Sequence, residues 1–133
     1  DVLLMYAEAM NELGKMDEAV WNKTIRPLRE RAGFTDAPSL IYPTEGNMQT
    51  IIRRERRVEL AMEGLRIFDI RRWKTAENVL NGYPHGAQFG EASIDNGYIR
   101  LEKRTFNPER DYLWAVPLSQ KDLNPNLGQN PGY

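Results

Sequence analysis

Apolar residues recur at helical spacing along the first quarter of the chain. After the first dozen residues, Gly14 stands where a helix commonly ends, and Asp17 stands where the next helix would be capped. Pro27 lies inside the second apolar stretch, so we expect a kink or a restart of that helix. Gly33 ends the pattern. Residues 1–33 therefore predict a helical hairpin.

A second helical region follows a loop. Prolines, a glycine and small polar residues over 34–46 predict the loop, and residues 47–80 predict a long helix that Gly64 breaks. The periodic positions around this break are Ile51, Glu55, Val58, Met62 and Leu65. Their steps of four and three predict a buried stripe that includes one glutamate.

Helical periodicity is lost over residues 81–133. Glycines and prolines are frequent there, and the tripeptide Asp95-Asn96-Gly97 favours a hairpin turn. Short strands are expected at 98–101, 105–106 and 112–116, and one helical turn at 119–123. The predicted fold class is mainly α: a helical hairpin, a long broken helix, and an irregular, loop-rich C-terminal part with short strands.

Charge is concentrated in the long helix and its continuation. Residues 53–74 carry eight cationic and four anionic side chains among many apolar ones, so we expect some ions to be paired below the surface. The predicted structural network comprises Glu55, Arg56, Glu59, Glu63, Arg66, Asp69 and Arg72. If an arginine is buried there, Glu55→Ala or Glu59→Ala should lower the free energy of unfolding by about 3–5 kcal/mol.

Length and composition fit one domain. The chain has 133 residues, of which 41% are apolar, and this is enough for a single core. A net charge of −1 provides no global field that would attract nucleic acid. No apolar run approaches the roughly 18 residues that a membrane helix needs. The absence of cysteine excludes disulfides and thiolate metal sites, and no metal or cofactor is predicted.

Few side chains suggest catalysis. His85 is the single histidine and lies between a proline and a glycine, so we expect it to be solvated. Glu59 and Glu63 lie one helical turn apart, as a carboxylate pair for acid–base chemistry can. Ion pairing of these carboxylates with Arg56 and Arg66 at helical spacing is the favoured interpretation.

The aromatic residues fall into two groups. Phe68, Trp73 and Trp114 lie in periodic segments and are expected in the core. The other group lies in the polar, glycine-rich stretch, where an exposed ring can stack on a sugar. These candidate ligand-binding residues are Tyr83, Phe89 and Tyr98. Ordinary loop packing is the alternative for them.

Five strings, in order along the chain, resemble one known family. They are LLMYAEAMNELGK at 3–15, IRPLRERAG at 25–33, ERRVELAMEGLRIFDIRRW at 55–73, YLWAVP at 112–117 and LGQNPGY at 127–133. Together they resemble the C-terminal region of the SusD/RagB family, the surface nutrient-binding lipoproteins of Bacteroidetes. Pro27 and Ala115 depart from the usual residues of that family. The spacing of residues 6–19 also resembles one tetratricopeptide-type unit.

The resemblance implies a fold, a role and a partner. It implies the C-terminal quarter or so of a longer, mostly helical protein with a tetratricopeptide-like scaffold, whose lipid anchor would lie upstream. Such a protein captures a glycan or other nutrient at the outer membrane and acts with a SusC-like TonB-dependent transporter, without catalysis. The shared motifs supply no ligand residue that can be carried over to this chain.

Two other function classes stay open. A helical-repeat interaction scaffold without its own ligand is suggested by residues 6–19, and further such units without a transporter partner would favour it. A glycoside hydrolase would depend on a carboxylate pair, and the pair that we name for this alternative is Glu59 and Glu63. Testing the Glu59→Gln variant for lost glycan cleavage separates this alternative from a binding role.

Overall fold

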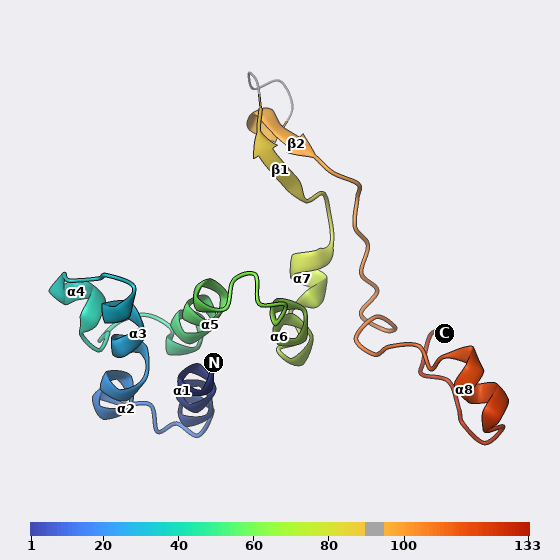
Figure 1. Cartoon of the computed structure of the whole chain (residues 1–133), viewed down its shortest axis with the longest axis horizontal. Coiled ribbons are helices and arrows are strands. Elements are labelled where there is room, and N and C mark those ends of the chain that lie inside the picture. Colours follow the sequence, from blue (N-terminus) through green and yellow to red (C-terminus); the bar gives the residue numbers. More distant parts are fainter. Residues whose placement is uncertain (90–94) are drawn as a thin grey trace. The chain divides into compact units, whose positions relative to one another are not determined.

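The computed structural model describes residues 1–89 and 95–133. These residues form two compact units, Asp1–Arg66 and Ile67–Tyr133 (Figure 1). Helices predominate and one small sheet accompanies them, so the predicted mainly α fold is confirmed. None of the helices in the described part of the chain combines the length and apolar character that a membrane crossing requires. That the whole chain folds as a single domain stays a prediction.

The first unit is a group of packed helices. Its helices are α1 (Val2–Glu12), α2 (Glu18–Lys23), α3 (Ile25–Arg31), α4 (Ala37–Leu40) and α5 (Met48–Glu59). Helix α1 contacts α2, α3 and α5, and α3 also contacts α5 (Figure 1). The predicted helical hairpin is therefore present, with α5 covering it as a further helix.

The helix ends follow the signals in the sequence. Gly14 takes a left-handed φ of +65° after α1, and the Asp17 carboxylate accepts a hydrogen bond of 2.8 Å from the backbone N–H of Val20 at the start of α2. The break between α2 and α3 comes at Thr24, whose backbone leaves helical geometry. Pro27 thus lies in the first turn of α3, where its missing N–H costs no helical hydrogen bond.

Helix α4 corrects the prediction of a continuous loop over 34–46. Asp36 caps this helix, because its carboxylate accepts a hydrogen bond of 3.0 Å from the backbone N–H of Ser39. A hydrogen bond from the Ser39 side chain, and to a lesser extent this backbone bond, lower the pKa of Asp36. A proline in the first turn is also compatible with a helix, so a composition typical of a loop can accommodate this short helix.

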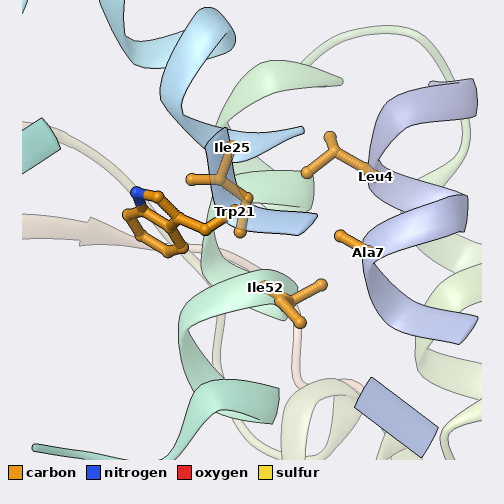
Figure 2. Close-up of a cluster of buried hydrophobic side chains, with 5 residues drawn as sticks. All are labelled: Leu4, Ala7, Trp21, Ile25 and Ile52. Atoms are coloured by element: carbon orange, nitrogen blue, oxygen red, sulfur yellow. The ribbon is translucent and has the colours of Figure 1, made fainter. Parts of the chain in front are cut away.

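The core of the first unit gathers side chains from α1, α2, α3 and α5. Its fully buried members are Leu4, Ala7, Trp21, Ile25 and Ile52 (Figure 2). The indole N–H of Trp21 donates to the carbonyl of Leu40 at 2.8 Å, so the largest core residue has no unsatisfied donor. Burial of these apolar groups is the main stabilising contribution to this unit.

The buried stripe of α5 is offset by one residue from the predicted one. Ile52, Arg56 and Leu60 are buried, whereas Val58 is 69% exposed. The helix ends at Glu59, and Met62 has a left-handed backbone, so the expected continuation to Leu65 does not exist. The early end removes the last predicted positions from the helix, and the packing of α5 on α1 and α3 decides which face is buried.

The second unit is less regular. After α6 (Arg66–Arg72), which begins at the boundary, it contains α7 (Ala76–Leu80), β1 (His85–Gln88), the 3₁₀ turn η1 (Asp95–Gly97), β2 (Tyr98–Arg100) and α8 (Leu118–Leu123). Strands β1 and β2 pair antiparallel, and Figure 1 shows them side by side. The predicted strand at 98–101 and helical turn at 119–123 are confirmed. Strand β1 was not predicted.

Two predicted features of this unit are wrong. The helix expected to continue to Leu80 is broken at Lys74, which has a left-handed φ of +53°, so α6 and α7 are separate. The expected strand at 105–106 is absent from the described residues, which have only one isolated bridge there, between Gly82 and Arg104.

A small core holds the start of the second unit together. It consists of Ile70, Ala76 and Phe106, and the Phe106 and Tyr112 rings meet edge to face at 4.9 Å. The amide side chain of Asn81 accepts from the Phe106 N–H at 2.7 Å and donates to its carbonyl at 3.3 Å. One side-chain amide thus satisfies both backbone groups, as a neighbouring strand would.

A third prediction for this unit, the strand at 112–116, is also wrong, because side chains and not a second strand satisfy the backbone there. Gln129 accepts from the Val116 N–H at 2.7 Å and donates to the Val116 carbonyl at 3.1 Å. Asn130 donates to the carbonyl of Trp114 at 2.6 Å, and the Tyr133 hydroxyl donates to that of Leu113 at 3.1 Å. We call these three side chains the amide clasp.

Two rings expected in the core are exposed. Helix α6 buries Ile70 but leaves Phe68 at the surface, and Trp114 is exposed as well. The Arg71 guanidinium lies 3.8 Å from the Trp114 ring centroid, a cation–π contact that helps to fix this ring. Trp73 is half-buried.

Candidate ligand site on the β-hairpin

All three candidate ligand-binding rings lie on or next to the hairpin. Tyr83 precedes β1, Phe89 follows it, and Tyr98 begins β2. All three rings are exposed, Phe89 most of all at 83%. Their ligand-binding role stays a prediction, but the hairpin brings into one region rings that are 15 positions apart in sequence.

A hollow of about 400 Å³ lies on the hairpin beside one of these rings. It is lined by His85, Asp95, Asn96 and Tyr98. The His85 and Tyr98 rings meet edge to face, with centroids 6.2 Å apart. Tyr83 and Phe89 do not line the hollow, so only Tyr98 of the three candidate rings can contact a ligand that lies in it.

The turn η1 has an unusual backbone that shapes the hollow. Asp95, Asn96 and Gly97 have φ values of +52°, +54° and +81°, three left-handed residues in a row. Aspartate, asparagine and glycine are the residues that adopt this region most readily. The turn is tied to β1 and its end, because Phe89 N–H donates to Gly97 O at 2.8 Å and the Gln88 side chain donates to Asn96 O at 3.0 Å.

Ionic contacts hold the carboxylate of Asp95. The Arg100 guanidinium donates to both Asp95 oxygens, and His85 Nε2 lies 3.2 Å from Oδ2. The Arg100 hydrogen bond, and then that of His85, lower the pKa of Asp95 to about 2. The same ion pair raises the pKa of Arg100. The guanidinium also lies 4.7 Å from the Tyr83 ring centroid.

Among the residues that the structure describes, the hollow therefore offers one aromatic ring, one amide, one imidazole and one ionised carboxylate. This combination suits a small ligand rich in hydroxyl groups, with the ring packing on its apolar side. Among the described residues, no group of three or more potential metal ligands occurs. Sequence reasoning missed Asp95 and Asn96 as site residues, although the turn motif they belong to was recognised.

The prediction for His85 needs correction. Its side chain is 44% exposed, as a solvated residue would be, but it lies on a strand and contacts Asp95. Because the strand was not predicted, this contact could not be expected from the sequence.

The charged segment forms ion pairs between elements more than along a helix. Arg29 of α3 donates through Nε to Glu55 of α5 at 3.1 Å, and Arg31 of α3 pairs with Glu59. The buried Arg56 pairs with Asp1. Within α6, Asp69 pairs with Arg72 at 3.0 Å.

Two details of the predicted network differ from the structure. Glu59 pairs with Arg31 rather than with Arg56. Glu63 lies beyond the end of α5, is exposed, and makes no ion pair within the ranges 1–89 and 95–133. Arg66 is half-buried. Pairing partners from α3 were missed because the packing of α3 on α5 leaves no mark in local sequence spacing.

The expected cost of breaking these pairs changes accordingly. The Arg29 and Glu55 side chains are only 12% and 17% exposed, so removing Glu55 would leave a largely buried guanidinium. Arg31 is 66% exposed, and water can solvate it when Glu59 is removed. The prediction of a large loss therefore applies to Glu55 alone.

The carboxylate pair considered for hydrolysis is not arranged as the sequence suggested. Helix α5 ends at Glu59, so Glu63 is not one helical turn further along the same helix. The Glu59 carboxylate is held by Arg31. This geometry gives no support to paired acid–base chemistry at these two residues.

Comparisons with known proteins agree on one family. A profile of the SusD family matches residues 1–133. The SusD-like protein P2 of Formosa agariphila is 34% identical over all of this chain and 24% of its own length. A crystal structure of a SusD-like carbohydrate binding protein from Bacteroides fragilis is 34% identical with a TM-score of 0.76, over 96% of this chain and 27% of that one.

A second SusD-like protein of Bacteroides fragilis is 28% identical, with a TM-score of 0.72, over 99% of this chain and 24% of that one. The chain thus spans about a quarter of the length of these relatives. The match of sequence and structure extends over both units. This chain belongs to the SusD family.

Proposed function

We propose that this chain is the C-terminal region of a surface glycan- or nutrient-binding lipoprotein of the outer membrane. The protein would work without catalysis, beside a SusC-like TonB-dependent transporter, anchored by a lipid outside this chain. The observation that carries the proposal is the match to the SusD family over all 133 residues. A structural relative that is itself described as carbohydrate binding supports a glycan as the ligand.

The hairpin supports a ligand-contacting role for this region. Exposed rings next to fixed polar groups are the usual means by which proteins bind sugars, because the ring covers apolar C–H groups while polar atoms bind the hydroxyls. Tyr98 with Asp95 and Asn96 has this composition. Tyr83 and Phe89 extend the aromatic surface of the hairpin and stay candidates for contacts outside the hollow.

The test is glycan-array binding by the full-length protein that carries this chain, followed by calorimetry on any bound oligosaccharide. Binding without cleavage of the bound glycan, together with co-purification of a TonB-dependent transporter, is the expected result. Cleavage by the wild-type protein would contradict the non-catalytic role. Failure to bind any glycan, with further helical repeats upstream and no transporter, would favour an interaction scaffold.

A further inference from the structure

We propose that the hollow on the hairpin is a subsite for a neutral saccharide ring and that Asp95 makes it reject anionic sugars. The inference rests on the glycan-binding role proposed above and narrows it to a class of ligand. It concerns the lining residues within 1–89 and 95–133, which are His85, Asp95, Asn96 and Tyr98.

The first step is that the hollow holds an aromatic ring in a fixed position. Tyr98 remains 45% exposed, so it has surface to offer a ligand, while its edge-to-face contact with His85 restrains the ring. A volume of about 400 Å³ is within the range of small-ligand sites. A saccharide ring has one apolar C–H side that packs on such a ring.

The second step is that the polar groups can still bind hydroxyls. Each carboxylate oxygen has more than one acceptor position, so Asp95 can accept from a ligand although Arg100 and His85 already contact it. The Asn96 side chain is exposed, and it makes no hydrogen bond to the residues described in the structure. It therefore offers one acceptor and two donors to a ligand.

The third step concerns charge. Asp95 lines the hollow, whereas Arg100, which neutralises it, does not. An anionic group in the hollow would therefore meet the carboxylate before the guanidinium. Two like charges at contact distance repel, and neither a uronate nor a sulfate can donate from its anionic oxygens to Asp95. A neutral hydroxyl at the same place donates a hydrogen bond, and bonds to charged acceptors are the stronger ones.

The preorganised turn supports this assignment. Three successive left-handed residues fix Asp95 and Asn96 next to Tyr98, and the bonds from Gln88 and Phe89 hold the turn from the opposite strand. A site whose polar groups are already fixed loses less conformational entropy when it binds a ligand. Unusual backbone conformations of this kind are concentrated at binding sites.

The test uses the full-length protein with linkage-matched pairs of oligosaccharides, such as β-1,4-mannotetraose and the β-1,4-mannuronate tetramer, in isothermal titration calorimetry. The panel covers several linkages, since the residues of the hollow do not specify one sugar. In the pair that the wild type binds, we expect its affinity for the neutral member to be at least about tenfold higher than for the anionic one. The loss of one charge-assisted hydrogen bond predicts a difference of this size. Tyr98→Ala should weaken neutral binding by about tenfold or more.

Two variants that change the charge of the hollow in opposite directions test the role of Asp95. Asp95→Asn keeps the shape of the side chain and removes its charge. The ratio of the affinities for the neutral and the anionic sugar should therefore fall toward one. Asn96→Asp adds a charge in a residue that also tolerates the left-handed turn, and it should increase the preference. Asp122→Asn, an equal charge change on the exposed helix α8, is the control and should leave both affinities unchanged.

Three results would overturn the inference, and they point to different failures. A wild type that prefers the uronate contradicts the charge selectivity. Glycan binding that Asp95→Asn and Tyr98→Ala both leave unchanged, in proteins shown to be folded by circular dichroism, places the ligand elsewhere while the glycan-binding role stands. Absence of binding to every oligosaccharide contradicts the proposed function itself, and the subsite falls with it.

Discussion

The two units of this chain stabilise their backbones in different ways. The first unit has a core cluster of five buried apolar side chains from four helices, and its backbone bonds are mostly helical. The second unit has a buried core of three residues and relies on side chains to satisfy irregular backbone, as Asn81 and the amide clasp do. Family motifs that are equally distinctive in the sequence can therefore stabilise the protein in different ways. Those of the first unit supply packed apolar side chains, and those of the second supply hydrogen bonds to the backbone.

Cation–π contacts add to the contrast. In the second unit, Lys74 Nζ lies 4.0 Å from the Tyr112 ring centroid, and the Arg110 guanidinium lies 5.5 Å from that of Tyr133. Such contacts at exposed sites contribute about 0.5–1 kcal/mol each. The aromatic side chains of this unit therefore stabilise it through exposed faces, not through burial alone.

The largest expected effect comes from matched truncations in the two cores. Ile52 and Ile70 are both 1% exposed, but Ile52 belongs to the larger cluster. Ile52→Ala should lower the free energy of unfolding by about 3–5 kcal/mol and Ile70→Ala by about 2–3 kcal/mol, because the smaller cluster can close around a cavity more easily. Urea denaturation measures both. Equal losses would remove the contrast between the cores.

The next effect tests the ion pairs of the first unit. Glu55→Ala should cost about 2–3 kcal/mol, because Arg29 is largely buried and loses its carboxylate. This is less than the about 3–5 kcal/mol expected from the sequence, since Arg29 keeps its hydrogen bond to the Ser39 carbonyl. Glu59→Ala serves as the matched variant and should cost less than about 1 kcal/mol, since Arg31 is exposed. Denaturation in low and high salt measures both losses. If Glu55→Ala costs no more than Glu59→Ala, solvent screens both pairs alike.

A smaller effect is expected from the amide clasp of the second unit. Gln129→Glu removes the donor to the Val116 carbonyl and should cost about 1–2 kcal/mol. The change should also speed amide hydrogen exchange at Val116. Gln120→Glu on the exposed face of α8 makes the same change of charge and should have little effect. Unchanged exchange at Val116 would mean that the clasp does not hold this segment.

The smallest effect is a titration on the hairpin. The pKa of Asp95 is about 2 instead of its usual 3.8, so the contribution of its ion pair to stability is present above about pH 4 and is lost as pH falls toward 2. Carbon-13 NMR of the carboxyl group should show a midpoint near 2. In Arg100→Gln the midpoint should move back toward 3.8. A midpoint near 3.8 in the wild type would contradict the ion pair.

Local signals in the sequence predicted the helical hairpin well and the later helix ends and irregular parts poorly. Asp17, Gly14 and Gly33 act within a few residues, so the ends they mark were found correctly. The early end of α5 was missed because Met62 and Leu65 continued the apolar spacing while Leu60 and the residues after it left the helix. The offset of the buried stripe by one position has another cause, because the packing of α5 on α1 and α3 decides which face is buried.

Contacts between distant residues account for the other errors. The pair of Arg29 with Glu55 spans 26 positions, and the bonds of the amide clasp span 13 to 20. The hollow is lined by residues of β1 and of the turn before β2. The contact between His85 and Asp95 could therefore be predicted only from the strand pairing. The rings were identified from composition, whereas their polar partners depend on the fold.

The two-stranded sheet also matters for how the protein must be handled. A sheet of two strands has an open edge on each side, and such an edge can accept a strand from another molecule. Here both strands are short, and Arg100 places a charge on β2, which disfavours pairing between copies. An engineer who lengthens the hairpin or replaces Arg100 with an apolar residue would therefore create a site of aggregation.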